Sequence, residues 1–209
     1  MAGMIMKQTL FLSLLLIGYS DISTPQNPNV TAEKDQAPLY LVIPSDPWEP
    51  IFFREINELA KIARLQNLRS VILPSNDLEV RIWGGFGEDF LQGLILKRVA
   101  GQWNALHLVR VHPRLPKSQS QIVQPSPKSG WEKCWERLIK EGLLTLPDSS
   151  TLKGRKMIRD GFSYVVEINK DGTYRTYMYG NPEQQDWQEA KQMVKVGEIL
   201  SDEFGFPSR

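Results

Sequence analysis

Two histidines, His107 and His112, are the side chains in this 209-residue chain best suited to acid–base or metal chemistry. A histidine that activates a nucleophile needs a serine or cysteine in contact with it and a carboxylate that orients its ring. Zinc needs several nitrogen, sulfur or carboxylate ligands, and Cys134 is the single cysteine. No Gly-x-Ser-x-Gly motif is present. We therefore assign no catalytic residue and expect no metal site.

The most glycine-dense segment runs from Trp83 to Gly87. A phosphate-binding loop needs glycines at set positions that lead into a helix, so that backbone amides point at the anion. The spacing here matches neither the dinucleotide pattern nor the P-loop pattern, and no Lys-Ser or Lys-Thr pair follows it. The segment is therefore interpreted as a turn, and no cofactor is expected.

Carboxylates offer a second route to chemistry, because two of them can share the acid and base roles in hydrolysis. Acidic residues that could form such a pair are Glu88 with Asp89, Asp148, Asp160 and Glu167. A chain of this length offers such pairs by chance, so the pattern has little specificity. A small extracytoplasmic hydrolase that uses His107 or a carboxylate pair is kept as the alternative function.

The clearest pattern for ligand binding lies in a predicted hairpin whose strands span residues 162–169 and 173–179. Its connection is interpreted as a type I turn with a glycine bulge at Gly172. Tyrosine and arginine are enriched at binding surfaces because they combine contact area with a polar group. The alternative is a solvated cross-strand salt bridge shielded by tyrosines. The predicted register places these candidate binding residues on one exposed face: Glu167, Arg175, Tyr177 and Tyr179.

The strands that surround this hairpin follow from alternating apolar residues. Such alternation predicts strands at 78–82, 92–99 and 103–111, which we expect to form a meander. A short apolar run at 39–43 predicts an edge strand. Together with the hairpin, these patterns predict a mostly antiparallel sheet of about five to six strands.

Three helices are predicted from apolar stripes at three- to four-residue spacing behind capping residues. The first begins near Asp46, the second spans 129–142, and the third begins at Asn181. Cys134 lies on the apolar stripe of the second helix, so its thiol is expected to be buried and inert. The expected fold class is therefore α+β.

Residues 39–206 are expected to form one α+β domain. The segment 113–129 contains four prolines and is interpreted as a long surface loop, with a linker between two halves as the alternative. The formal net charge is +1 and there is no long run of Lys or Arg. Nucleic acid is therefore not an expected partner, because phosphate neutralisation needs a clustered basic face.

Residues 1–20 have the pattern of a cleavable signal peptide. Lys7 supplies the positive charge, and the apolar stretch 9–17 is shorter than the ~18 residues that span a membrane. Small residues at Gly18 and Ser20 fit cleavage after Ser20. An uncleaved anchor is the alternative. After cleavage, we expect no membrane span.

Lipid attachment is not expected at this segment, because Tyr19 stands where a lipoprotein box carries its cysteine. Residues 21–38 are polar and proline-bearing and are interpreted as a disordered linker. The sequence thus favours a secreted or periplasmic, non-enzymatic binding domain of a bacterial envelope. Its ligand is an unidentified protein, peptide or glycan. Whether the chain is an enzyme and what its oligomeric state is stay open at this point.

Overall fold

The computed structural model describes residues 39–85, 91–111, 121–154, 156, 158 and 161–207. The predicted signal peptide at 1–20 and the predicted linker at 21–38 lie outside the described residues. Within the described ranges, no helix is long and apolar enough to cross a membrane.

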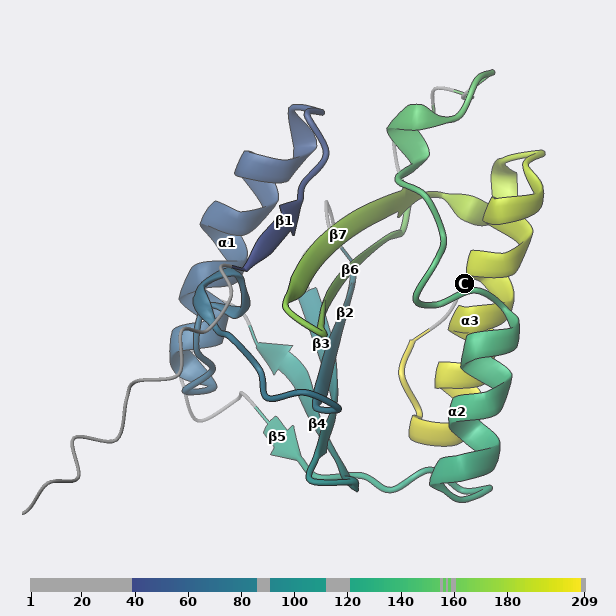
Figure 1. Ribbon diagram of the computed structural model, residues 1–209. Coiled ribbons are helices and arrows are strands. Elements are labelled where there is room, and N and C mark those ends of the chain that lie inside the picture. The colour runs from purple at the N-terminus through teal and green to yellow at the C-terminus, as the bar shows by residue number, and fades with distance from the viewer. Residues whose placement is uncertain are drawn as a thin grey trace, which may run out of the picture. The chain divides into compact units, whose positions relative to one another are not determined.

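The centre of the fold is one mixed sheet of seven strands in the order β1-β7-β6-β2-β3-β4-β5 (Figure 1). Six neighbouring pairs join these strands; the pair of β1 with β7 is parallel and the others are antiparallel. The strand bounds are β1 Tyr40–Val42, β2 Leu78–Gly84, β3 Leu91–Val99, β4 Gln102–Val111, β5 Gln121–Val123, β6 Ser163–Lys170 and β7 Thr173–Gly180.

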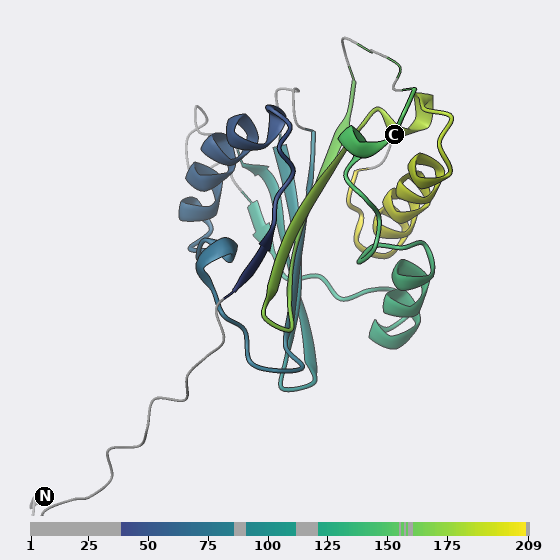
Figure 2. The ribbon, with the colours of Figure 1, turned by 45° about the horizontal axis from the view of Figure 1, so that its top comes forward.

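Helices cover both faces of this sheet: α1 lies on one face, and α2 and α3 lie on the other (Figures 1 and 2). The bounds of the helices are α1 Trp48–Ile62, α2 Trp131–Lys140 and α3 Gln188–Phe204, with short 3-10 helices η1 Leu68–Ser70, η3 Ser149–Thr151 and η4 Pro182–Gln184.

The alternation of side chains along the strands supplies a core on each face. On the α1 face, Phe52 and Ile56 of the helix pack in one cluster with Trp83 and Ile95 of the sheet. The cluster on the other face is larger, and it includes Val80 from β2 with residues of α2 and α3. Burying each such aliphatic or aromatic side chain is worth roughly 1.5–3 kcal/mol, so both helix layers are held by apolar burial.

The α+β class, the single domain and the three helices are confirmed, but the predicted strand number was too low. The missed strand, β5, has three residues and lies within the segment 113–129, which was expected to be a loop. Three residues are too few for a recognisable alternation, and their pairing with β4 is decided by distant residues. The pairing of β2 with β6 joins the parts of the chain before and after that segment in one sheet.

Helix starts also differ from the sequence expectation. Asp46 does accept a hydrogen bond from the backbone N–H of Trp48, at 3.1 Å. Gly130, however, is the N-cap of α2. After Asn181 the chain first forms η4, and α3 begins only at Gln188.

Candidate functional site

The prediction of an exposed binding face on the hairpin is wrong, because the observed register of β6 with β7 differs from the predicted one by one residue. The structure pairs Ile168 with Arg175 and Val166 with Tyr177. The connection is a two-residue turn in which Asp171 and Gly172 have φ angles of 50° and 71°, without the expected bulge. Positive φ at both positions is the pattern of a type I′ turn. A slip of one residue moves the affected side chains to the opposite face of a sheet.

Arg175, Tyr177 and Tyr179 therefore point toward the α2–α3 side. Both tyrosines have 0% of their surface exposed. The Tyr177 hydroxyl donates to the Leu143 carbonyl at 2.7 Å, and the Tyr179 hydroxyl donates to the Pro147 carbonyl at 2.9 Å. Burial raises the pKa of both hydroxyls, which keeps them protonated as donors.

The guanidinium of Arg175 completes this set of contacts by donating to the carbonyls of Leu144, at 2.5 Å, and of Leu146. All these acceptors lie in the segment that follows α2, where carbonyls lack helical partners. The three side chains thus attach that segment to β7, which is a structural role in the interior.

Glu167 is not brought together with these residues, because it lies on the α1 face and is 2% exposed. Its carboxylate accepts hydrogen bonds from Trp83 Nε1 at 2.7 Å and from the Tyr174 hydroxyl at 3.0 Å. Burial raises the pKa of Glu167, although the charge of Arg81 and these two hydrogen bonds oppose the rise. Arg69 extends the network by donating from Nε to the Tyr174 hydroxyl, at 3.3 Å.

His107, the residue of the alternative hydrolase, is 5% exposed and lies on the α2–α3 side of β4. Its Nε2 is 3.2 Å from Gln92 Oε1, and its ring centroid is 5.6 Å from that of Phe206. Burial lowers the pKa of this imidazole. Within the described residues, neither a nucleophile nor a carboxylate contacts it, so the arrangement needed for a catalytic histidine is not present there.

The candidate carboxylate pairs also lack a catalytic arrangement among the described residues. Asp148 Oδ2 accepts from the backbone N–H of Met178 at 2.8 Å, and Oδ1 accepts from that of Ser150 at 2.9 Å, so both oxygens hold backbone. No group of three or more His, Cys, Asp or Glu residues suited to a metal ion occurs in the described part of the chain. Lying outside the described residues are His112, Glu88, Asp89 and Asp160.

Cys134 is buried in α2, as the helical stripe predicts. Burial, with a smaller contribution from the charge of Glu203, raises the pKa of its thiol to about 12. A thiol of that pKa is almost entirely protonated at neutral pH and is a poor nucleophile.

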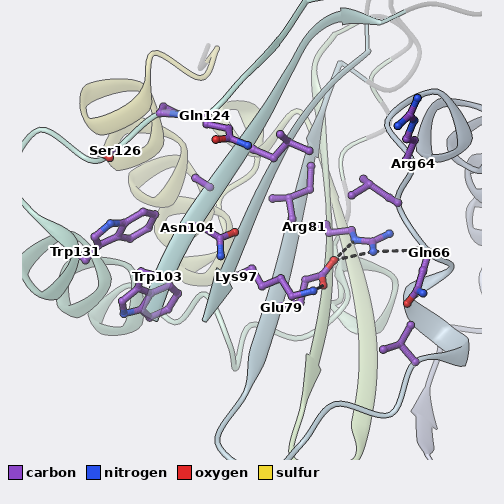
Figure 3. Close-up of a pocket in the computed structure, with 16 residues that line it drawn as sticks. Arg64, Gln66, Glu79, Arg81, Lys97, Trp103, Asn104, Gln124, Ser126 and Trp131 are labelled. Atoms are coloured by element: carbon purple, nitrogen blue, oxygen red, sulfur yellow. Dashed lines mark hydrogen bonds and ion pairs between the residues drawn. The ribbon is translucent and has the colours of Figure 1, made fainter. Parts of the chain in front are cut away.

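A different site is present at the sheet edge formed by β4. It is a cleft of about 670 Å³, within the range of small-ligand and peptide sites, and we name it the β4 cleft. Figure 3 shows Trp103 and Trp131 at one end, Arg64 and Gln66 at the other, and Asn104 between them. The lining residues are Arg64, Leu65, Gln66, Val71, Glu79, Arg81, Ile95, Lys97, Trp103, Asn104, Ala105, Leu106, Gln124, Pro125, Ser126 and Trp131.

A charged triad forms the floor of the β4 cleft. Arg81 Nε donates to Glu79 Oε1 at 2.8 Å, and Lys97 Nζ lies 3.2 Å from Glu79 Oε2. Arg81 also donates to the carbonyl of Gln66 at 2.9 Å (Figure 3). Two cations share one carboxylate, so the triad has a net charge of +1. Arg64 at the rim adds a second positive charge to the lining.

Tryptophans form the wall of the cleft on the α2 side. The indoles of Trp103 in β4 and Trp131 in α2 are stacked, with centroids 5.4 Å apart and an interplanar angle of 7°. Trp135, one helical turn further along α2, lies with its centroid 4.7 Å from that of Trp103. The three indoles thus pack against one another and present an aromatic wall to the cleft.

Sequence reasoning placed part of the β4 cleft lining on predicted strands and a predicted helix, placed residues 124–126 in a loop, and did not group these residues into a site. Glu79 and Arg81 were visible as the polar positions of an alternating strand. The local sequence holds no signal that Lys97 lies opposite Glu79, because that contact depends on the register of β2 with β3. Comparison of the chain with protein-family models, with curated proteins and with solved structures finds no significant match.

Proposed function

We propose that this protein is an exported, non-enzymatic binding domain whose ligand occupies the β4 cleft. The observation that carries the proposal is the cleft itself, which combines a wall of stacked tryptophans with charged and amide side chains. Sites of this composition bind by shape and a few polar contacts. Within the described lining, Glu79 is the only carboxylate, it is paired with Arg81 and Lys97, and no histidine is present, which favours binding over acid–base catalysis there.

The extracytoplasmic location is part of the same proposal, and it is supported by the signal-peptide pattern of residues 1–20. Expression of the full chain in a bacterium, followed by fractionation and N-terminal sequencing, tests it. We expect the extracytoplasmic fraction to contain a chain that begins at Asp21. Full-length chain retained in the cytosol would contradict export without affecting the cleft.

The binding role is tested by filling the cleft. Asn104 is exposed and lines the β4 cleft, so Asn104→Trp adds a bulky side chain there without disturbing the core. Lys133→Trp is the control, since Lys133 is exposed on α2 but is not among the lining residues and lies outside β4. The wild-type chain and both variants are applied to a peptide array and to a glycan array.

We expect the wild-type chain and Lys133→Trp to retain the same ligands, while Asn104→Trp binds them about tenfold or more weakly, the equivalent of one good polar contact. Equal retention by all three proteins would contradict the proposal. The same proteins are assayed with chromogenic esters and glycosides. Turnover that His107→Ala abolishes would establish the hydrolase alternative.

A further inference from the structure

Among the described residues, β5 covers only part of the outer edge of β4. β4 has ten residues and β5 has three, and β5 pairs only with His107, Leu108 and Val109. Within the described residues, the stretch Gln102–Leu106 has no strand on that side. An uncovered strand edge presents backbone N–H and C=O groups that can accept another strand.

The turn between β3 and β4 determines which backbone groups of this stretch face outward. Ala100 and Gly101 form a two-residue turn with φ angles of 48° and 79°. In such a hairpin the closing residues hydrogen-bond to each other and the orientation alternates after them, which directs Trp103 and Ala105 away from β3.

The lining of the β4 cleft shows that the cavity reaches this edge. Side chains of a strand alternate between faces, so a cavity on one face touches every second residue. β2 contributes Glu79 and Arg81 in that way, and β3 contributes Ile95 and Lys97. β4 instead contributes the four consecutive residues of the stretch 103–106. The cavity therefore extends around the edge of β4, where the segment 124–126 and Trp131 form its far wall.

Resting on the proposed function, we propose that the ligand is an extended peptide that adds to β4 as an antiparallel strand beside Trp103 and Ala105. Main-chain hydrogen bonds to an open edge supply affinity in this mode, and alternate side chains supply specificity. The free stretch of five residues is roughly 17 Å long at the rise of an antiparallel strand, which accommodates about five peptide residues.

The surroundings of the edge define the side chains of this peptide. A residue opposite Asn104 points to the α1 side, toward Lys97 and the net positive triad, which favours an acidic side chain. Residues opposite Trp103 and Ala105 point to the other side, toward Trp131, which favours apolar side chains. The peptide is therefore one in which apolar and acidic residues alternate.

A blocked hexapeptide of alternating valine and glutamate is the probe, and its dissociation constant for the mature chain is measured by calorimetry. Its valine amides would face β4, and its glutamate amides would face solvent. We expect N-methylation of the valine amides to weaken binding by about tenfold or more, because each lost hydrogen bond has an effect of that order. N-methylation of the glutamate amides should change the dissociation constant by less than about threefold.

A second series tests the charge. Replacing the glutamates with lysines should weaken binding by about tenfold or more, and Lys97→Gln should weaken the glutamate peptide more than a glutamine peptide. Equal tolerance of both N-methylated peptides would overturn strand addition. In that case the proposed function would still stand if Asn104→Trp abolished peptide binding. It would also stand if the chain bound only a glycan and Asn104→Trp abolished that binding. Insensitivity of every ligand to Asn104→Trp would overturn both.

Discussion

The carboxylate of Glu203 holds together the two helices on the tryptophan side of the fold. It lies in the last turn of α3 and is 4% exposed. It accepts hydrogen bonds from the backbone N–H and the hydroxyl of Ser129, each at 2.8 Å, and from Arg137 Nη1 at 2.5 Å. Ser129 leads into α2, which carries Trp131, so this contact positions the wall of the β4 cleft.

Replacing Glu203 with glutamine keeps the shape of the side chain but removes its charge. Hydrogen bonds to a charged group contribute about 1.5–3 kcal/mol each, and Arg137 is 39% exposed, so solvent screens its share. The glutamine oxygen still accepts one bond, while its NH₂ group faces a donor. We therefore expect Glu203→Gln to lower the free energy of unfolding by about 2–3 kcal/mol at pH 7.

The pH dependence of this effect has a defined sign. Burial by itself would raise the pKa of Glu203, but the hydrogen bonds from Ser129 and the charge of Arg137 outweigh it and lower the pKa below its ordinary value. A lowered pKa in the folded state stabilises the protein above the unfolded pKa, near pH 4, and this stabilisation is lost as the pH falls through the folded value. The difference between wild type and Glu203→Gln should shrink accordingly.

Urea unfolding of both proteins between pH 7 and pH 3, followed by tryptophan fluorescence, measures this difference. Asp202→Asn is the control, because Asp202 is 73% exposed and lies 3.8 Å from the same arginine. We expect this control to change stability by less than about 0.5 kcal/mol. Equal losses in the two variants, or a loss for Glu203→Gln that does not shrink between pH 7 and pH 3, would refute the reasoning.

Three further predictions concern the interior. A Cβ at Gly93 would lie 2.5 Å from Trp83 Cζ3, so Gly93→Ala should lower the free energy of unfolding by about 1–3 kcal/mol, measured in urea. An equally large loss in a Trp83→Leu background would contradict this cause. Tyr177→Phe leaves the Leu143 carbonyl without its donor and should cost about 1–2 kcal/mol of unfolding free energy without changing ligand retention on the arrays; unchanged stability would refute it. Cys134 should resist iodoacetamide at pH 8 in the folded chain and react in urea, as read by mass spectrometry, whereas rapid labelling of the native protein would contradict its burial.

Local patterns determined which segments became helices and long strands. The apolar stripe of 131–139 placed Cys134 in the core because helical periodicity repeats within a few residues and needs no distant partner. Alternation in 78–82 identified β2, and the Asp-Gly pair located the hairpin turn of β6 and β7. These signals lie within single elements, so the sequence contains them directly.

Strand register decided which faces of those strands met. A type I′ turn in place of a bulged one moved Arg175, Tyr177 and Tyr179 from a predicted surface to the interior, because strand side chains alternate with a period of two. The β4 cleft likewise exists because β5 is shorter than β4 and because Lys97 pairs with Glu79 across β2 and β3. The cleft depends on contacts between residues far apart in the chain, whereas the Asp171-Gly172 pair is itself a local signal for the type I′ turn that sets the hairpin register. Composition and periodicity therefore determined the elements of this protein, and only long-range strand pairing decided where a ligand could bind.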